Sequence, residues 1–486
     1  MTAKALMFMG TGSDVGKSLI VAGLCRLLAN RGTSIAPFKP QNMSNNAAVT
    51  SDGGEIGRAQ ALQARAARVA SIVHMNPILL KPETSTGAQV IVQGKRRATM
   101  GAKEFFGARQ QFMPAILESF DVLRSSHDIV LVEGAGSPAE INLRDGDLAN
   151  MGFARAANVP AILVGDIHRG GVMASISGTF DLLDPDDRSL LKAFIINKFH
   201  GDQSLFSDGI TVLEARTQTP CLGVVPHFSN AHLLPAEDAV ALDQMTSNHS
   251  NKTKICVLRL PRIANFDDLD PLRLEANATL QLVQLGNPIP GDARLVIIPG
   301  SKSTMTDLAA LRQTGWDIDL RAHLRRGGHI LGLCGGYQML GKSIRDPHRL
   351  EGPVGHMEGL GLLDVDTALA PEKTLCHVAA THQFLQAPIA GYQIHLGMTS
   401  GEACSRPFAV TDKGEHDGAV SLDHRIQGTY LHGCFASDAF RKAYLHSIGI
   451  TVDDFAYDQT IESTLDQLAD HLAHSLDIDR LLQFAL

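Results

Sequence analysis

The chain has 486 residues, a formal net charge of −8 at pH 7, 44% hydrophobic residues and 19% charged residues. This composition is ordinary for a globular protein and excludes disordered and fibrous classes, and the acidic balance excludes the basic footprint of a nucleic-acid-binding protein. The length exceeds that of one hydrophobic core and favours two domains. No apolar run approaches the ~20 residues of a membrane span and no cleavable signal follows Met1, so we expect a cytoplasmic protein with small-molecule partners.

The cysteines indicate neither a disulfide framework nor a structural zinc site. Seven cysteines are scattered along the chain, and none belongs to a CxxC pair. We therefore interpret most of them as small buried hydrophobic residues. Cys334 is the exception, because of the sequence around it.

Short β-branched runs alternate with helical stretches through the first half of the chain. Continuous apolar strands bounded by Gly, Pro and Asp are typical of a parallel sheet covered on both faces. The pattern predicts a doubly wound α/β domain over residues 1–242, followed by a polar linker over 243–252. The predicted strands are residues 5–9, 128–132, 161–165, 193–197 and 221–225.

The second half repeats the α/β pattern over residues 253–486, which we expect to form a second domain. Leucines at helical spacing from about Asp453 onwards predict amphipathic helices that close this domain. The predicted strands are residues 254–258, 295–300, 329–333, 419–422 and 426–430.

A glycine-rich segment, GTGSDVGKS at residues 10–18, joins the first predicted strand to an apolar helix. Such a turn points consecutive backbone N–H groups at phosphate oxygens, and the helix dipole adds to the attraction. Lys17 is then expected to contact the β and γ phosphates of ATP, and the Ser18 hydroxyl to bind Mg²⁺. The remaining predicted nucleotide contacts in this segment are Gly12, Val15 and Gly16.

Thr11 stands where the usual G-x-x-x-x-G-K-[ST] pattern has its first glycine. With this departure the segment resembles the dethiobiotin-synthetase-like branch of phosphate-loop proteins, whose members activate carboxylates by phosphorylation. Glu133 ends a buried strand where that branch needs a Mg²⁺ carboxylate, and a turn carboxylate is the alternative interpretation. Asn197 and Lys198 are similar to the base-reading segment of these nucleotide binders, since an amide offers a donor and an acceptor to adenine.

Cys334 stands in the segment GLCGGYQ, residues 332–338, between a predicted strand and a predicted helix. A tight strand-to-helix turn directs a cysteine out of the sheet, where it acts as a nucleophile. The flanking glycines remove Cβ atoms that would clash in such a turn. A packed core thiol is the alternative, which these glycines and Gln338 disfavour.

The same segment resembles the class I glutamine amidotransferases, in which the cysteine attacks the side-chain amide of glutamine. The resemblance implies His432, in the string GTYLHG, as general base and acid. It also implies the N–H groups of Gly300 and Gly335 as an oxyanion hole, with Gln338 beside the bound glutamine. The family usually has a glutamate two residues after the histidine, where this chain has Cys434. We therefore expect a dyad in place of a triad.

Segments spread over both halves resemble the cobyric acid synthase family of cobalamin biosynthesis. The resemblance implies a ligase that uses ATP and glutamine to amidate the b, d, e and g carboxylates of a cobyrinic acid a,c-diamide, usually adenosylated. It implies an acyl phosphate intermediate and a dry passage for ammonia. The segments are residues 37–46, 55–60, 75–82, 136–143 and 265–272.

Candidate contacts with this cobalt corrinoid lie in or beside two of these segments. Gln41 and Asn42 belong to the first, and Asn142 and Asp145 lie in a polar run for which an ordinary solvated loop is the alternative. His168 replaces an acid that the family commonly has, so the resemblance assigns no role to that position.

Two other functions remain open from the sequence. One is a cobyrinic acid a,c-diamide synthase, which performs the same chemistry on the earlier carboxylates; the string KPQNM at residues 39–43 favours the later enzyme. The other is a phosphate-loop switch that binds a partner protein, with an inactive amidotransferase domain. Cys334 and His432 are both present, which disfavours the switch. The sequence also leaves a homo-oligomer open.

Overall fold

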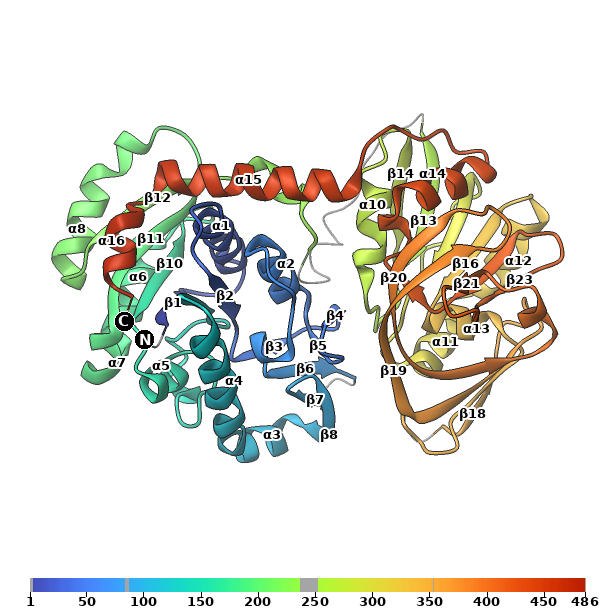
Figure 1. Cartoon of the computed structure of the whole chain (residues 1–486), viewed down its shortest axis with the longest axis horizontal. Coiled ribbons are helices and arrows are strands. Elements are labelled where there is room, and N and C mark those ends of the chain that lie inside the picture. Colours follow the sequence, from blue (N-terminus) through green and yellow to red (C-terminus); the bar gives the residue numbers. More distant parts are fainter. Residues whose placement is uncertain (1–2, 84–86, 237–251, 353, 486) are drawn as a thin grey trace. The chain divides into compact units, whose positions relative to one another are not determined.

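The computed structural model describes residues 3–83, 87–236, 252–352 and 354–485, and the chain divides into two compact units (Figure 1). Unit 1 comprises Met1–Ser44, Thr50–Pro235 and Ile461–Leu486, and unit 2 comprises Asn45–Val49 and Ala236–Thr460. The linker predicted at 243–252 lies, apart from Lys252, outside the described residues. Of the helices in the described part, none is both long and apolar enough to span a membrane.

Unit 1 is built on a six-stranded sheet in the order β12-β11-β10-β1-β9-β2, with every neighbouring pair parallel. All residues of β9 are buried, as are most of β1 and β10, so both faces of the sheet are covered. This confirms the predicted α/β class with a parallel sheet. The strands are β1 (Lys4–Gly10), β2 (Ile35–Phe38), β9 (Ile129–Glu133), β10 (Ala161–Asp166), β11 (Leu191–Phe199) and β12 (Cys221–Pro226).

Helices and a smaller sheet complete the first part of unit 1. Because the strands of the main sheet are parallel, the loops that follow their carboxyl ends meet at one edge, where α/β proteins bind ligands. The smaller sheet contains β3 (Gln41–Met43), β6 (Ile78–Pro82), β7 (Gly87–Val92) and β8 (Lys95–Gly101). The helices are α1 (Lys17–Asn30), α2 (Arg58–Ala66), α3 (Ala102–Ala108), α4 (Met113–Ser126), α5 (Met151–Ala157), α6 (Val172–Leu182), α7 (Pro185–Leu190) and α8 (Ser207–Thr217).

The C-terminal helices α15 (Tyr457–Ser475) and α16 (Ile478–Gln483) are the predicted amphipathic helices. From Ile461 onwards they belong to unit 1, whereas the sequence placed them in the second domain. A Cβ at Gly23 of α1 would lie 2.5 Å from Cδ1 of Leu472, which belongs to α15, so α1 and α15 pack in close contact. The buried Arg26 also pairs with Glu462. The leucine spacing predicted the helices correctly but carried no information on which core they cover.

Unit 2 contains a second six-stranded sheet, in the order β14-β13-β15-β16-β24-β23, which is parallel except for the last pair. Its strands are β13 (Thr253–Leu258), β14 (Ala278–Val283), β15 (Ala293–Ile298), β16 (His329–Leu333), β23 (Ala419–Val420) and β24 (Ile426–Thr429). Its helices are α10 (Asp270–Arg273), α11 (Thr304–Gln313), α12 (Trp316–Arg325), α13 (Gly335–Leu340) and α14 (Asp438–Ser447).

A second, largely antiparallel sheet lies in unit 2 and is dominated by the long hairpin of β19 and β20. Sequence periodicity did not predict this sheet, because its strands are half exposed and lack continuous apolar runs. The strands of this second sheet are β17 (Ser343–Arg345), β18 (His356–Glu358), β19 (Asp366–His382), β20 (Pro388–Ser400), β21 (Ala409–Thr411), β22 (His416–Asp417) and β25 (Leu431–His432).

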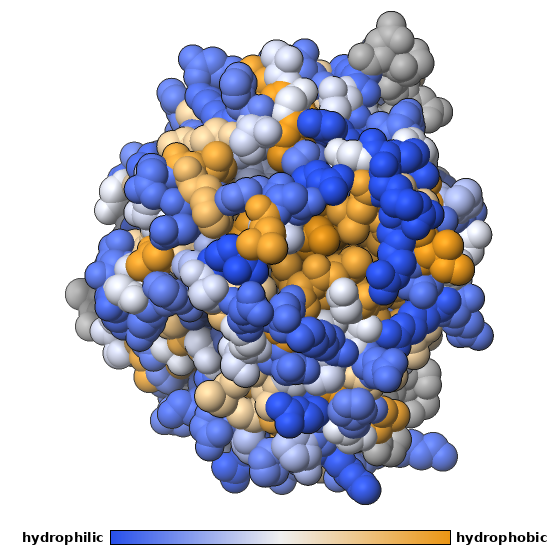
Figure 2. Space-filling model, turned by 90° about the vertical axis from the view of Figure 1, so that its right-hand side faces the viewer, coloured by the Kyte–Doolittle hydropathy of each residue, from blue (hydrophilic) through white to orange (hydrophobic). Residues whose placement is uncertain are grey.

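Figure 2 shows one face of the molecule, on which hydrophilic residues surround a central apolar area.

Candidate active sites

The glycine-rich segment forms the predicted turn between β1 and α1. Gly16 takes the left-handed conformation, with φ of 94°, directly before the helix, a conformation that glycine adopts at no steric cost. The buried Lys17 donates from Nζ to the carbonyl oxygens of Gly12 at 3.0 Å and Gly136 at 3.3 Å. The lysine ammonium is therefore held inside the loop, between the turn itself and the segment that follows β9.

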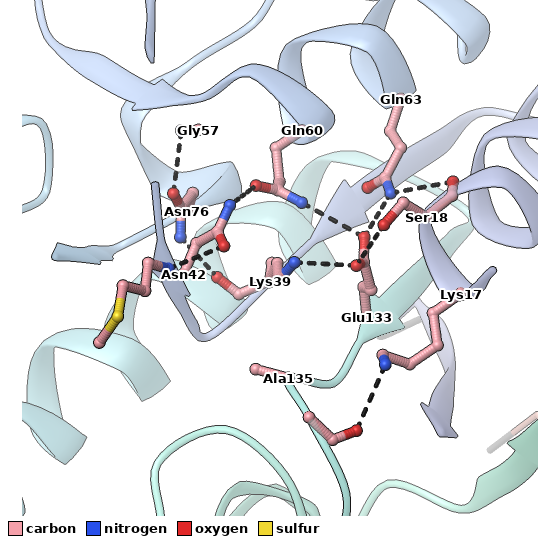
Figure 3. Close-up of polar contacts among 12 residues, drawn as sticks. Lys17, Ser18, Lys39, Asn42, Gly57, Gln60, Gln63, Asn76, Glu133 and Ala135 are labelled. Atoms are coloured by element: carbon pink, nitrogen blue, oxygen red, sulfur yellow. Dashed lines mark hydrogen bonds and ion pairs between the residues drawn. The ribbon is translucent and has the colours of Figure 1, made fainter. Parts of the chain in front are cut away.

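Glu133, at the end of β9, is the centre of a buried polar network (Figure 3). Its Oε1 accepts hydrogen bonds from the Ser18 hydroxyl and from Lys39 Nζ, each at 2.8 Å. Its Oε2 accepts from Gln63 Nε2 at 2.5 Å and from Gln60 Nε2 at 3.3 Å. Burying a carboxylate is costly unless it is paired and hydrogen-bonded. The four donors meet that requirement.

The sequence predicted Ser18 and Glu133 at this site and missed Lys39, Gln60 and Gln63. All three lie within or just beyond the segments 37–46 and 55–60, which carried the family resemblance. That resemblance was the available signal. No sequence motif identifies the two glutamines. They face Glu133 because they lie three residues apart on α2, and so on the same side of the helix.

The donor set fits a magnesium ion shared with a nucleotide. A hydroxyl and a carboxylate oxygen converge at the carboxyl edge of the sheet, and Mg²⁺ prefers oxygen ligands. Across the described residues, no group of three or more His, Cys, Asp and Glu side chains is placed to hold a metal ion. Mg²⁺ in nucleotide sites usually takes one or two protein oxygens and completes its shell with phosphates and water. Ser18 and Glu133 are sufficient for that arrangement.

Asn197 and Lys198 lie beside the phosphate loop, at the carboxyl end of β11. Asn197 Nδ2 donates to the carbonyl of Val15 at 2.8 Å. Lys198 Nζ contacts Asp166 Oδ2 at 3.0 Å and also donates to the carbonyl of Asp14. The bond to Val15 uses one N–H of the Asn197 amide, so a base-reading role for this residue would use its other N–H and its amide oxygen.

The candidate corrinoid contacts differ in their surroundings. Asn42 is buried and donates from Nδ2 to Gln60 Oε1 at 2.9 Å, so it supports the Glu133 network. Gln41 is half buried on β3. Asn142 and Asp145 are exposed on the loop that follows β9. The second pair is therefore directly accessible to a large ligand, and Asn42 is not.

Cys334 forms the predicted elbow between β16 and α13. Its φ of 50° and ψ of −106° are strained for a residue with a Cβ, as is common at functional turns. Its N–H donates to the carbonyl of Thr429 at 2.8 Å, and its Sγ lies 3.7 Å from the carbonyl oxygen of Ile394. At Gly336, a Cβ would lie 2.0 Å from the carbonyl oxygen of Ile298, so the turn requires glycine there.

His432 lies between the elbow and a carboxylate that the sequence did not predict. Its Nδ1 is 2.7 Å from Asp268 Oδ2, and the Gly433 N–H donates to Asp268 Oδ1 at 2.5 Å. The imidazole Nε2 is buried and has no hydrogen-bond partner within the described part of the chain. Burial alone would lower the pKa of His432, but Asp268 and the neighbouring Cys334 raise this pKa well above its ordinary value.

Asp268 is a candidate third member beside the expected dyad, since it pairs with the imidazole although Cys434 stands where the family usually has its glutamate. Asp268 belongs to a 3₁₀ turn, η6 (Phe266–Leu269), 164 positions before His432. The segment 265–272 carried part of the family resemblance, so its run of aspartates was the only signal. The residues next to His432 in the sequence therefore do not identify Asp268 as its partner.

Backbone positions predicted for the oxyanion hole lie close to these side chains. A Cβ at Gly300 would be 3.2 Å from His432 Cε1, and a Cβ at Gly335 would be 3.0 Å from the backbone nitrogen of Ser301. The first N–H groups of a helix have no intrahelical partner, and Gly335 is the first residue of α13. The structure thus brings Gly300, Gly335 and His432 to one place.

Gln338 is buried one helical turn after Cys334 and is held at both ends of its amide. Its Nε2 donates to the Tyr430 hydroxyl at 3.2 Å, and the Thr304 hydroxyl donates to its Oε1 at 3.1 Å. The same hydroxyl is 3.2 Å from Glu351 Oε1, and burial raises the pKa of Glu351 to about 7. Thr304 and Glu351 were not predicted, and both flank the residue predicted to contact glutamine.

Comparisons with known proteins agree with this division into two chemistries. Residues 6–240 match the family model of the CobQ/CobB/MinD/ParA nucleotide binding domain. Residues 254–440 match that of the CobB/CobQ-like glutamine amidotransferase domain. The predicted fold class, a phosphate-loop α/β domain followed by a class I glutamine amidotransferase domain, is thereby confirmed, and the nucleotide-binding domain implies use of ATP.

Relatives match over the whole length of the chain. A cobyric acid synthase of Bradyrhizobium diazoefficiens is 58% identical and covers 99% of this chain and 100% of its own. One of Cereibacter sphaeroides is 56% identical and covers 99% of each, and one of Jannaschia is 56% identical and covers 100% of each. The chain belongs to the cobyric acid synthase family, glutamine amidotransferase ligases of cobalamin biosynthesis.

Proposed function

We propose that this chain hydrolyses glutamine at Cys334 and uses the ammonia, with ATP bound at the phosphate loop, to amidate four carboxylates of a cobyrinic acid a,c-diamide. The observation that carries the proposal is the presence of two complete constellations in one chain. The first is Lys17, Ser18 and Glu133, and the second is Cys334, His432 and Asp268. A partner-binding switch with an inactive amidotransferase domain would have no need to retain the second.

In the proposed hydrolysis, Cys334 Sγ attacks the amide carbon of glutamine. The N–H groups of Gly300 and Gly335 stabilise the oxyanion, and removing one such donor typically costs ~3 kcal/mol of barrier. His432 Nε2 carries the proton that the leaving ammonia takes up, and Asp268 fixes the ring through Nδ1. Water then attacks the thioester, with His432 accepting its proton, and releases glutamate.

In the proposed synthetase reaction, a carboxylate oxygen of the acceptor attacks the γ-phosphorus of ATP and ADP leaves. Lys17 holds the β and γ phosphates. Mg²⁺, held by Ser18 and Glu133, would neutralise phosphate charge when bound. Lys39 pairs with Glu133 at 2.8 Å and holds its side chain in the buried network. Ammonia then attacks the acyl phosphate carbon, and inorganic phosphate leaves.

Mass spectrometry of the products tests the proposal and separates it from its nearest rival. With purified protein, ATP and glutamine, four amide additions to the a,c-diamide support it. Two additions to cobyrinic acid, and none to the diamide, would identify an a,c-diamide synthase. The matched control is Cys334→Ala, which should lose glutamine-dependent amidation and keep amidation driven by a high concentration of ammonium chloride.

A further inference from the structure

Three large apolar side chains of unit 1 are exposed near the proposed synthetase site. Phe106, Ile141 and Leu143 are 45%, 50% and 40% exposed, and we refer to them as the apolar platform. Arg109 connects two of the three, since its Cζ lies 4.7 Å from the centre of the Phe106 ring and its Nη2 donates to the Leu143 carbonyl at 2.8 Å. Apolar side chains gathered in this way often mark a binding surface.

The loop that carries Ile141 and Leu143 is fixed in place. Arg144 makes two hydrogen bonds, of 2.5 and 2.8 Å, to the carboxylate of the buried Asp187. Arg109 also donates to the carbonyl of Asp145. These contacts hold the loop at and directly after Leu143, so a ligand meets a surface that is already formed.

The same loop leads directly from the nucleotide site. It begins after Glu133, and its Gly136 carbonyl accepts from Lys17 Nζ. Ile141 is five residues further on, so its backbone lies within about 18 Å of Gly136 even if the chain is fully extended. An acceptor resting on the platform therefore lies within reach of a phosphate bound at Lys17, provided that the acceptor is a large molecule.

Polar residues alternate with the apolar ones on this loop. Glu140, Asn142 and Asp145 are exposed beside Ile141 and Leu143. Their side chains accept hydrogen bonds from amide N–H groups, and the two carboxylates repel other carboxylates. The surface therefore suits an apolar ring whose rim carries amides. The exposed area of three side chains is also far below the ~800 Å² that one partner contributes to a protein interface, so the platform suits a small molecule better than a protein.

We propose that the apolar platform binds the macrocycle of the corrinoid acceptor, with the amidated part of its rim toward Glu140 and Asp145. The unreacted carboxylates are then directed away from these acids and toward Lys17. This inference rests on the proposed function and adds to it the place where the acceptor lies.

The test measures steady-state constants of the full-length enzyme carrying Ile141→Ser together with Leu143→Ser. The KM for the a,c-diamide should rise about tenfold or more, because two apolar side chains lose their contact with the ring. The KM values for ATP and glutamine should stay within about twofold, as expected for side chains that point into solvent. The matched control is Leu205→Ser with Val212→Ser, which are exposed apolar residues elsewhere in unit 1 and should change none of the three constants.

An unchanged acceptor KM in the platform variant would overturn the inference, and so would an equal rise in the KM for ATP, which would indicate a structural role for the loop. Equilibrium dialysis of the corrinoid without ATP gives a second readout and should show the same loss. If the wild-type enzyme amidates no corrinoid, the proposed function fails. If it does so and the variant binds normally, only the platform fails.

Discussion

The Nδ1 atom of His432 lies 2.7 Å from Oδ2 of Asp268, and both side chains are almost completely buried. This ion pair joins the strand that presents the histidine to a turn at the start of unit 2. Its geometry is that of an imidazole held in one orientation by a carboxylate.

Replacing Asp268 by Asn should lower kcat for glutamine hydrolysis by roughly 10²-fold or more, because general acid–base catalysis contributes about that much and depends on the ring orientation. Ammonium-dependent amidation should be retained. A glutaminase assay coupled to glutamate detection measures the effect. The matched control is Cys434→Ala, which alters the position where the family usually has its acid and should leave kcat close to that of the wild type. A loss in the control as large as that in Asp268→Asn would contradict the assignment.

The same substitution should have a pH-dependent effect on stability. The pKa of His432 is raised in the folded protein, above the ordinary value of about 6.5. A raised pKa contributes stability that is fully present below the ordinary value and is lost as the pH rises through the folded-state value. Urea unfolding at pH 6, 7.5 and 9 should therefore show the largest cost of Asp268→Asn at pH 6. A cost that grows toward pH 9 would rule this out.

Lys17→Ala should abolish amide transfer and leave glutamine hydrolysis intact. The substitution removes the ammonium that two loop carbonyls hold in the phosphate turn, and Cys334 belongs to the other compact unit. Parallel measurement of ADP and glutamate release distinguishes the two activities. Loss of both would show that glutamine hydrolysis depends on a correctly filled nucleotide site.

Gly336→Ala should destabilise unit 2, since the new Cβ would lie 2.0 Å from the Ile298 carbonyl oxygen. Overpacking of this kind costs about 1–3 kcal/mol when the surroundings can adjust, and here the obstacle is backbone. Thermal unfolding gives the measurement. Gly291→Ala provides the control, because no atom lies within 4 Å of its added Cβ. Equal melting temperatures for the two variants would be inconsistent with the tight elbow.

Leu472→Ala should destabilise unit 1 by about 2–5 kcal/mol, the usual range for a buried leucine. Leu472 is buried against Gly23 of the helix that follows the phosphate loop. Limited proteolysis of the full-length protein, with the cleavage sites in unit 1 located by mass spectrometry, reports the loss of packing. Exposed Leu182→Ala in the same unit serves for comparison and should resist proteolysis like the wild type.

The parts that could be predicted from sequence are those whose chemistry is local. The turns at Lys17 and Cys334 each need glycines within a few residues, so a short string identifies them. Most strands of the two six-stranded sheets are short apolar runs, which are also local, although β2 and β14 were not predicted. Glu133 was predicted for the same reason, since it directly follows such a run.

The parts that were missed depend on contacts across long stretches of chain. Asp268 meets His432 only after the fold has formed, and no spacing rule connects positions 164 residues apart. Lys39, directly after β2, and Gln63, on α2, reach Glu133 in the same way. The packing of α15 on α1 was missed because an amphipathic stripe indicates a buried face without identifying its partner.

The packing of residues 461–486 into unit 1 has a consequence for biosynthesis. A ribosome makes the phosphate loop before Leu472, with all of unit 2 between them. Domains normally fold in the order in which they emerge. In this chain the surface of unit 1 around Gly23 stays uncovered until unit 2 and then residues 461–486 have been translated. A chaperone that binds nascent chains would therefore shield unit 1 for longer than unit 2.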